Sequence, residues 1–129
     1  MLTQHQIQEF KTLLEQRYRE VREIIRQALM RSDEQSYIEL AGQVQDMENF
    51  SVADLLIDVA LADIDRHVEE IRDIDAALMR IANGSYGVCT DCEEAIEVKR
   101  LEAYPTAKRC RPCQENNENR SGGPRRTSL

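Results

Sequence analysis

The sequence has little of what usually fills a thick hydrophobic core. Its 129 residues include no tryptophan and only two phenylalanines. Aromatic side chains supply much of the buried area in ordinary domains, so their scarcity argues against a thick globular core. The charged content is 32%, above the roughly 25% that is usual in globular domains. We therefore expect an elongated or thinly cored protein.

Two further absences limit location and partners. No run of about 18 apolar residues occurs, and the first 30 residues lack the basic start and apolar stretch of a signal peptide, so we expect a soluble, cytoplasmic protein without membrane contact. The net charge of −7 argues against affinity for nucleic-acid phosphates, which depends on Lys and Arg. A basic protein partner fits better.

The acidity is concentrated in the first two thirds of the chain. Residues 1–83 hold 17 acidic and 9 basic side chains, whereas residues 84–113 hold five of each. The stretch 46–65 alone has six acidic side chains and no Lys or Arg. This pattern predicts a negatively charged surface on the first segment.

Residues 1–83 show the spacing of apolar residues that is typical of long helices. Thr3 and Gln6 can form a capping box that starts the first helix. Its apolar positions are Ile7, Leu14, Val21 and Ala28 in one row, Phe10 and Ile24 in a second row, and Tyr18 and Ile25 beside it.

A second helix is predicted over residues 52–83. Ser51 and Asp54 resemble a capping box, and the pair Asn83 and Gly84 is a typical helix end. The apolar residues repeat every seven positions over about four heptads. They are Ile57, Ile64, Ile71 and Leu78, flanked by Ala60, Leu61, Val68, Ile74 and Ile81.

These two helices predict an all-α fold whose main part is a long antiparallel coiled-coil hairpin, residues 1–83. Gly42 and the polar stretch through Phe50 mark the turn, and we place the tip near residues 43–51. Residues 34–44 either extend the first helix or fold over it. Because an amphipathic helix needs a partner, the economical arrangement is a hairpin within one chain, and hence a monomer. A coiled coil made from two chains is the alternative.

The four cysteines predict a metal site. Cys89 and Cys92 are separated by two residues, as are Cys110 and Cys113, and 17 residues lie between the pairs. This spacing is typical of a tetrahedral site with four thiolates and one Zn²⁺. Disulfides or a redox switch are the alternatives, but a reducing cytoplasm favours metal. Four protein ligands leave no open coordination position, so the zinc is expected to be structural.

We expect no enzymatic activity, because the sequence contains no phosphate-binding loop, nucleophile elbow or Cys/His pair. The tail, residues 120–129, is polar and interrupted by Gly and Pro, and we expect it to be disordered.

The finger motif resembles that of DksA/TraR proteins. The matching residues are 84–92, 100–107 and the final pair Cys110 and Cys113 followed by Gln114; one departure is Glu93, where glycine is common. The resemblance implies a C4 zinc finger with a short C-terminal helix over residues 84–119. It also implies a transcription regulator that binds RNA polymerase, not DNA, by inserting its hairpin into the secondary channel.

The same resemblance assigns roles to individual positions. The family's tip carries two acids and an alanine, and the matching residues are Asp46, Asn49 and Ser51; Arg66 matches a basic residue and is a possible polymerase contact. Basic residues that help bind guanosine tetraphosphate are replaced by Asp73, Tyr104 and Gln114, so no dependence on this alarmone is expected. The alternative function is a zinc-stabilised helical adaptor or dimerising module that does not act on RNA polymerase.

Overall fold

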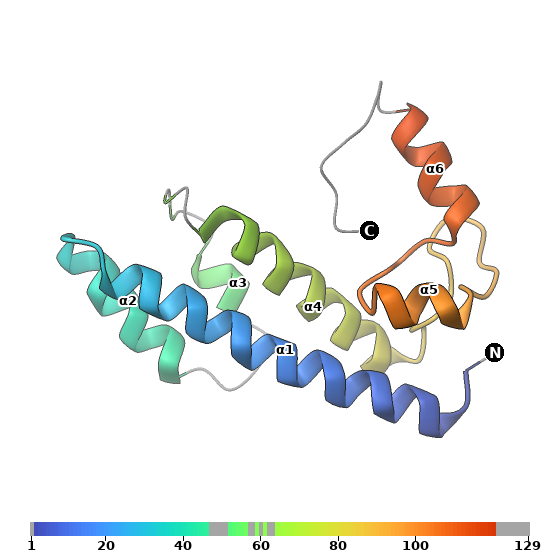
Figure 1. The fold of residues 1–129 in the computed structure, drawn as a ribbon, viewed down its shortest axis with the longest axis horizontal. Helices are drawn as coiled ribbons and strands as arrows, with labels where there is room; N and C mark the ends of the chain where they lie inside the picture. Colours follow the sequence, from blue (N-terminus) through green and yellow to red (C-terminus); the bar gives the residue numbers. More distant parts are fainter. Residues whose placement is uncertain (1, 47–51, 57–58, 60, 62–63, 121–129) are drawn as a thin grey trace. The chain divides into compact units, whose positions relative to one another are not determined.

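The computed structural model describes residues 2–46, 52–56, 59, 61 and 64–120. The described residues form helices joined by turns and contain no β-strand, which confirms the all-α prediction (Figure 1). The helices are α1 (Gln4–Met30), α2 (Gln35–Asp46), α3 (Val52–Leu55), α4 (Asp65–Asn83), α5 (Val98–Ala103) and α6 (Arg111–Arg120). None of the helices in these ranges is long and apolar enough to cross a membrane.

The chain divides into two compact units. Unit 1 comprises residues 1–14 and 76–129, and unit 2 comprises residues 15–75. Helices α1 and α4 each contribute to both units, because the divisions fall within them. The predicted tail lies almost wholly in residues 121–129, which are outside the described residues.

Helix α1 begins as the sequence predicts. The backbone N–H of Gln6 donates to Thr3 Oγ1 (3.1 Å), and the N–H of Thr3 donates to Gln6 Oε1 (2.9 Å), which completes the capping box. Most predicted core positions of α1 are buried: Phe10, Leu14, Tyr18, Val21, Ile25 and Ala28. Ile24 was wrongly placed in a core row, because it is 39% exposed; Leu29, one helical turn after Ile25, is buried with the core instead.

Unit 2 contains more helices than a simple hairpin. Helix α1 ends at Met30, and the chain reverses direction at residues 31–34 before α2 (Figure 1). Residues 35–46 are thus a separate helix with Ala41 and Val44 buried, which answers the question that the sequence left open. Gly42 lies inside α2, so it was wrongly taken as a turn residue. Of the predicted tip, residues 43–46 end α2 and residues 47–51 lie outside the described residues.

The prediction of one continuous helix over residues 52–83 is wrong. Helix α3 ends at Leu55, and Leu56 N–H bonds to Ala53 O (3.1 Å) in a tight turn; α4 begins only at Asp65. A straight helix would place residues 53 and 75 about 33 Å apart. Instead, the backbone N–H of Ala53 faces the carboxyl group of Asp75. The chain therefore folds back, which lets Val52, Ala53 and Leu56 be buried.

Within unit 2, α1 and α4 are joined by an ion pair. Arg17 donates from Nε to Glu70 Oε2 (2.6 Å) and from Nη2 to Glu70 Oε1 (3.0 Å). These bonds raise the pKa of Arg17. Because both side chains are partly exposed, we regard this pair as a modest contribution to stability. The apolar contacts of Val21, Ile25, Ile64 and Ile71, which are all fully buried, contribute more.

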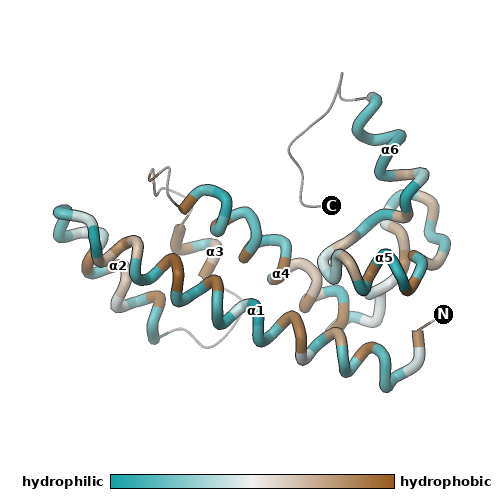
Figure 2. The backbone as a smooth tube through the Cα atoms, viewed as in Figure 1, coloured by the Kyte–Doolittle hydropathy of each residue, from teal (hydrophilic) through white to brown (hydrophobic). Residues whose placement is uncertain are grey.

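Unit 1 joins the start of α1 and the end of α4 to the cysteine-bearing segment. Helix α4 ends at Asn83 and Gly84 has a φ of +85°, as the predicted helix end requires. The ring of Tyr86 lies 5.8 Å from that of Phe10, and the Tyr86 hydroxyl donates to Pro105 O (2.8 Å). Figure 2 shows that hydrophilic and hydrophobic residues alternate along α1 and α4, as expected for helices with one buried face.

Candidate metal centre

The four cysteines come from two separate segments of unit 1. Cys89 and Cys92 lie in the loop between α4 and α5, while Cys110 precedes α6 and Cys113 lies in its first turn. The N–H of Thr90 donates to Lys108 O (2.9 Å), and this bond ties the two segments together. Gln114 N–H donates to Cys110 O (2.9 Å), which starts α6 at the second cysteine pair.

The first cysteine pair sits on a tight backbone turn. Glu93 N–H donates to Cys89 O (3.0 Å), and Cys89 N–H donates to Glu94 O (2.8 Å). A single antiparallel bridge, Val88 with Ala95, continues this pairing. Glu93 has a φ of +64°, the only positive value at a non-glycine residue among those described. This conformation explains why glycine is common at the position in similar fingers.

We expect Glu93→Gly to stabilise the finger by about 1 kcal/mol, because glycine adopts a positive φ without the steric cost that other residues meet. Zinc-loaded protein should unfold at a higher urea concentration and retain zinc at least as well. The matched control is Glu94→Gly, at a neighbouring exposed position without a positive φ, which should destabilise the finger slightly. Equal effects of the two substitutions would contradict the role of the positive φ.

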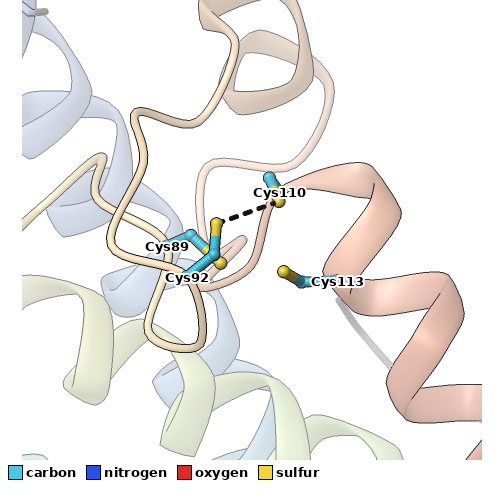
Figure 3. Close-up of side chains that lie close together, drawn as sticks. All are labelled: Cys89, Cys92, Cys110 and Cys113. Atoms are coloured by element: carbon cyan, nitrogen blue, oxygen red, sulfur yellow. Dashed lines mark hydrogen bonds between the residues drawn. The ribbon is translucent and has the colours of Figure 1, made fainter.

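The four sulfur atoms converge on one point (Figure 3). All four Sγ atoms lie within 4.8 Å of one another, and the cysteines are free thiols. Cys92 Sγ and Cys110 Sγ are 3.7 Å apart. Tetrahedral zinc with bonds of about 2.3 Å requires sulfur separations of about 3.8 Å, so the arrangement fits Zn²⁺. It is a C4 site for one structural zinc.

The electrostatics of the cluster also fit a divalent cation. Burial alone would raise the pKa of Cys89. The backbone N–H groups of Cys92, Cys110 and Asp91 have a larger opposite effect, so the pKa is lowered to about 6. Proximity of Cys110 and Cys92 raises the pKa of Cys113 to about 12. Four thiolates therefore cannot coexist without compensation. When bound, zinc supplies that positive charge and crosslinks the two segments, and four sulfur ligands leave no position for water or substrate.

A chain of hydrogen-bonded polar side chains runs from the first cysteine loop to α6. Arg109 Nε donates to Asp91 Oδ2 (3.0 Å), and Arg109 Nη1 lies 3.5 Å from Gln114 Oε1. Gln114 Nε2 donates in turn to Glu118 Oε2 (2.9 Å), and Gln114 is only 4% exposed. This network links the first cysteine loop to α6. Such outer contacts orient metal ligands. The spacing of the cysteines does not predict them.

The other predicted site residues lie in unit 2. Asp46 is the exposed last residue of α2, and Arg66 is exposed in the first turn of α4. Asn49 and Ser51 lie outside the described residues. Sequence reasoning also missed Asp75, which is buried; its position, four residues after Ile71 and three before Leu78, places it on the core face and was a usable signal.

Comparison with known proteins supports both the finger and the fold. Residues 84–119 match the prokaryotic dksA/traR C4-type zinc finger. The RNA polymerase-binding transcription factor DksA of Caulobacter vibrioides is 46% identical over 56 residues, which are 43% of this chain and 39% of the relative. The matched segment thus spans about two fifths of that protein's length.

Two comparisons extend beyond the finger. The RNA polymerase-binding transcription factor DksA of Salmonella typhimurium is 26% identical over 115 residues, 88% of this chain and 72% of the relative. The solved structure of transcription factor DksA2 from Pseudomonas aeruginosa superposes with a TM-score of 0.62 at 25% identity, covering 93% of this chain and 88% of that chain. The similarity therefore includes the helical part.

Proposed function

Because this chain is a DksA-like protein with a C4 zinc finger, we propose that it binds RNA polymerase and regulates transcription by inserting unit 2 into the secondary channel. The observation that carries the proposal is the combined likeness of finger and helical fold to DksA proteins, since the finger alone covers residues 84–119. The protein would act in the cytoplasm, as a monomer and without catalysis of its own.

The distribution of charge supports this mode of binding. Unit 2 contains 16 acidic and 7 basic side chains, a net charge of −9, whereas unit 1 contains 8 acidic and 10 basic side chains. A strongly negative unit is steered toward a positively charged channel, and the same charge disfavours contact with DNA phosphates. Unit 1, with its zinc, would hold the complex at the channel entrance.

The proposed tip is residues 43–51, with Asp46, Asn49 and Ser51 as its functional residues. Asp46 is an exposed carboxylate at the end of α2, where it can reach a partner, and Asn49 and Ser51 follow it in the chain. Because Asn49 carries no charge and Ser51 replaces the alanine of similar proteins, the output would differ from that of regulators with two tip acids. Arg66 is exposed and is the proposed polymerase contact on α4.

Independence from guanosine tetraphosphate is part of the proposal. Gln114 is buried and bonded to Glu118, so its side chain does not present a cation to a phosphate. Asp73 carries the opposite charge to the one required, and Tyr104 is 47% exposed but uncharged. We therefore expect the same transcriptional output with and without the nucleotide.

The test uses core RNA polymerase and a second factor that occupies the secondary channel. The protein should copurify with polymerase at moderate salt and be displaced by the competitor. Asp46→Asn should change the output of a reconstituted transcription assay at least about twofold while leaving polymerase affinity nearly unchanged, because the tip acts near the active centre. The double substitution Asn49→Asp with Ser51→Ala should shift the transcriptional output toward that of regulators with two acidic residues at the tip.

Arg66→Glu is the binding counterpart to the tip variants. It should weaken polymerase affinity, since it reverses a charge at a proposed contact while leaving α4 helical. If Arg66→Glu abolishes binding but no tip variant alters output, the protein occupies the channel without tip chemistry. If the unmodified protein does not bind polymerase, the alternative of a zinc-stabilised helical adaptor replaces the proposal.

A further inference from the structure

Unit 2 contains a buried carboxyl group that the proposed function does not use. Asp75, on α4, is 9% exposed, and both of its carboxyl oxygens are buried with no hydrogen-bond partner among the described residues. Buried acids are normally paired or hydrogen-bonded, because an ionised carboxylate is costly to remove from water. This arrangement therefore favours the protonated form of Asp75.

The groups around Asp75 come from two other helices. On α3, the backbone N–H of Ala53 faces its carboxyl group, and Asp54 brings a second negative charge. On α1, Tyr18 lies within electrostatic reach of Asp75, the N–H of Val52 faces the Tyr18 hydroxyl, and Arg22 lies near Tyr18. The start of α3 thus rests on a pair of polar groups, Tyr18 and Asp75, within a core of buried apolar residues.

We propose that α3 is a pH-sensitive clasp, docked on α1 and α4 while Asp75 is protonated and released when Asp75 ionises. Ionisation places a negative charge in a buried site opposite Asp54, and undocking α3 relieves both the burial and the repulsion. The N–H of Ala53 is the one facing donor on α3, and it only partly offsets this cost.

The surroundings of Asp75 also shift its pKa. Burial and then the charge of Asp54 raise the pKa of Asp75 from its ordinary value of 3.8 to about 7, against the opposing N–H of Ala53. The pKa of this carboxyl group is higher when α3 is docked than when it is undocked. Docking is therefore most stable at a pH below the undocked pKa, and it loses stability as the pH rises from the undocked to the docked pKa. Docking should therefore weaken between about pH 4 and pH 7 and stay weak above that range.

The clasp does not depend on polymerase binding, although α3 and the proposed tip are adjacent in the sequence. Val52, the first residue of α3, directly follows Ser51 of the proposed tip. The experiment below uses the isolated protein, so its failure would leave the polymerase proposal untouched.

The test measures hydrogen exchange of the backbone amides of residues 52–56 in zinc-loaded, full-length protein from pH 5 to pH 8, corrected for the intrinsic exchange rate. Protection of these amides should fall roughly 50- to 100-fold over this range, since each unit between the undocked and docked pKa values is a factor of ten. Protection of the amides of α1 around Val21 should stay nearly constant. Carbon-13 NMR of the side-chain carboxyl group should show Asp75 titrating near pH 7.

Three variants separate the clasp from general effects of charge. Asp75→Asn, which cannot ionise, should keep residues 52–56 protected at all pH values. Asp54→Asn should lower the titration midpoint of Asp75 because one repelling charge is lost. Asp33→Asn, which changes an exposed acid in the turn between α1 and α2, should leave the profile unchanged.

Two results would overturn the clasp. One is an Asp75 carboxyl in the unmodified protein that titrates near pH 4. The other is exchange at residues 52–56 that does not depend on pH in the unmodified protein, or that depends on it equally in Asp75→Asn. The carboxyl titration needs no variant, so it decides the question even if Asp75→Asn fails to fold.

Discussion

Removing the zinc is expected to unfold residues 84–119 and to leave most of the helical signal of unit 2 intact. The finger has a small core of its own, in which the buried residues are Tyr86, Cys89, Ile96, Leu101 and Ala107. In zinc-finger peptides, metal binding contributes roughly 10–16 kcal/mol at neutral pH, more than such a core can supply. The core of unit 2 lies in residues 15–75 and contains no zinc ligand.

Cys110→Ser tests this expectation without a chelator. A serine hydroxyl is not deprotonated at neutral pH and cannot replace a thiolate, so zinc affinity should fall by at least about 100-fold. Metal analysis should show less than one zinc per chain under competition, and amides near Tyr86 should lose protection from exchange. Far-UV circular dichroism should retain most of its helical signal.

Ala103→Ser is the matched control for the zinc experiment. It adds a hydroxyl at an exposed position of α5 in the same finger but leaves all four ligands in place. It should bind one zinc with unchanged affinity. A stable, protected finger in metal-free Cys110→Ser, or a disulfide between Cys89 and Cys92 in protein purified under reducing conditions, would contradict the structural role of zinc.

The metal site was predictable because zinc chemistry is local. Each cysteine pair needs only a two-residue spacing to wrap a metal, so Cys89, Cys92, Cys110 and Cys113 could be assigned from sequence alone. The surrounding network was less visible, because Arg109 and Gln114 contact their partners only after the two segments have folded together. The positive φ of Glu93 was indicated only by its departure from the glycine that is common there.

Some helix ends were predicted correctly, but the helices of unit 2 were not, because local helix propensity and tertiary contacts favour different structures there. Capping by Thr3 and termination at Gly84 depend on neighbouring residues, and both were predicted correctly. Residues 56–64 contain neither Gly nor Pro and were predicted to be helical, yet α3 ends at Leu55, and Leu56, Val59 and Leu61 are not in a helix. The break lets α3 bury Val52 against the rest of unit 2. A heptad pattern cannot predict the burial of α3, because this burial depends on contacts with residues that are distant in the sequence, Tyr18 and Asp75.

Ile71→Ala is expected to destabilise the protein by roughly 2–5 kcal/mol. Ile71 is fully buried in unit 2, and truncation removes three carbons from a site where the surrounding helices can close the cavity only in part. Urea unfolding of the zinc-loaded protein, followed by circular dichroism, should show a lower midpoint with a similar slope.

Ile24→Ala makes the same chemical change in α1 of the same unit, but Ile24 is 39% exposed, so its cost should stay below about 1 kcal/mol. Equal losses for the two variants would mean that Ile71 is not in the core. Both midpoints should also be independent of protein concentration, because the core of unit 2 is formed by residues 15–75 of one chain. A midpoint that rises steeply with concentration would instead favour the coiled coil made from two chains, since association stabilises the folded state by mass action.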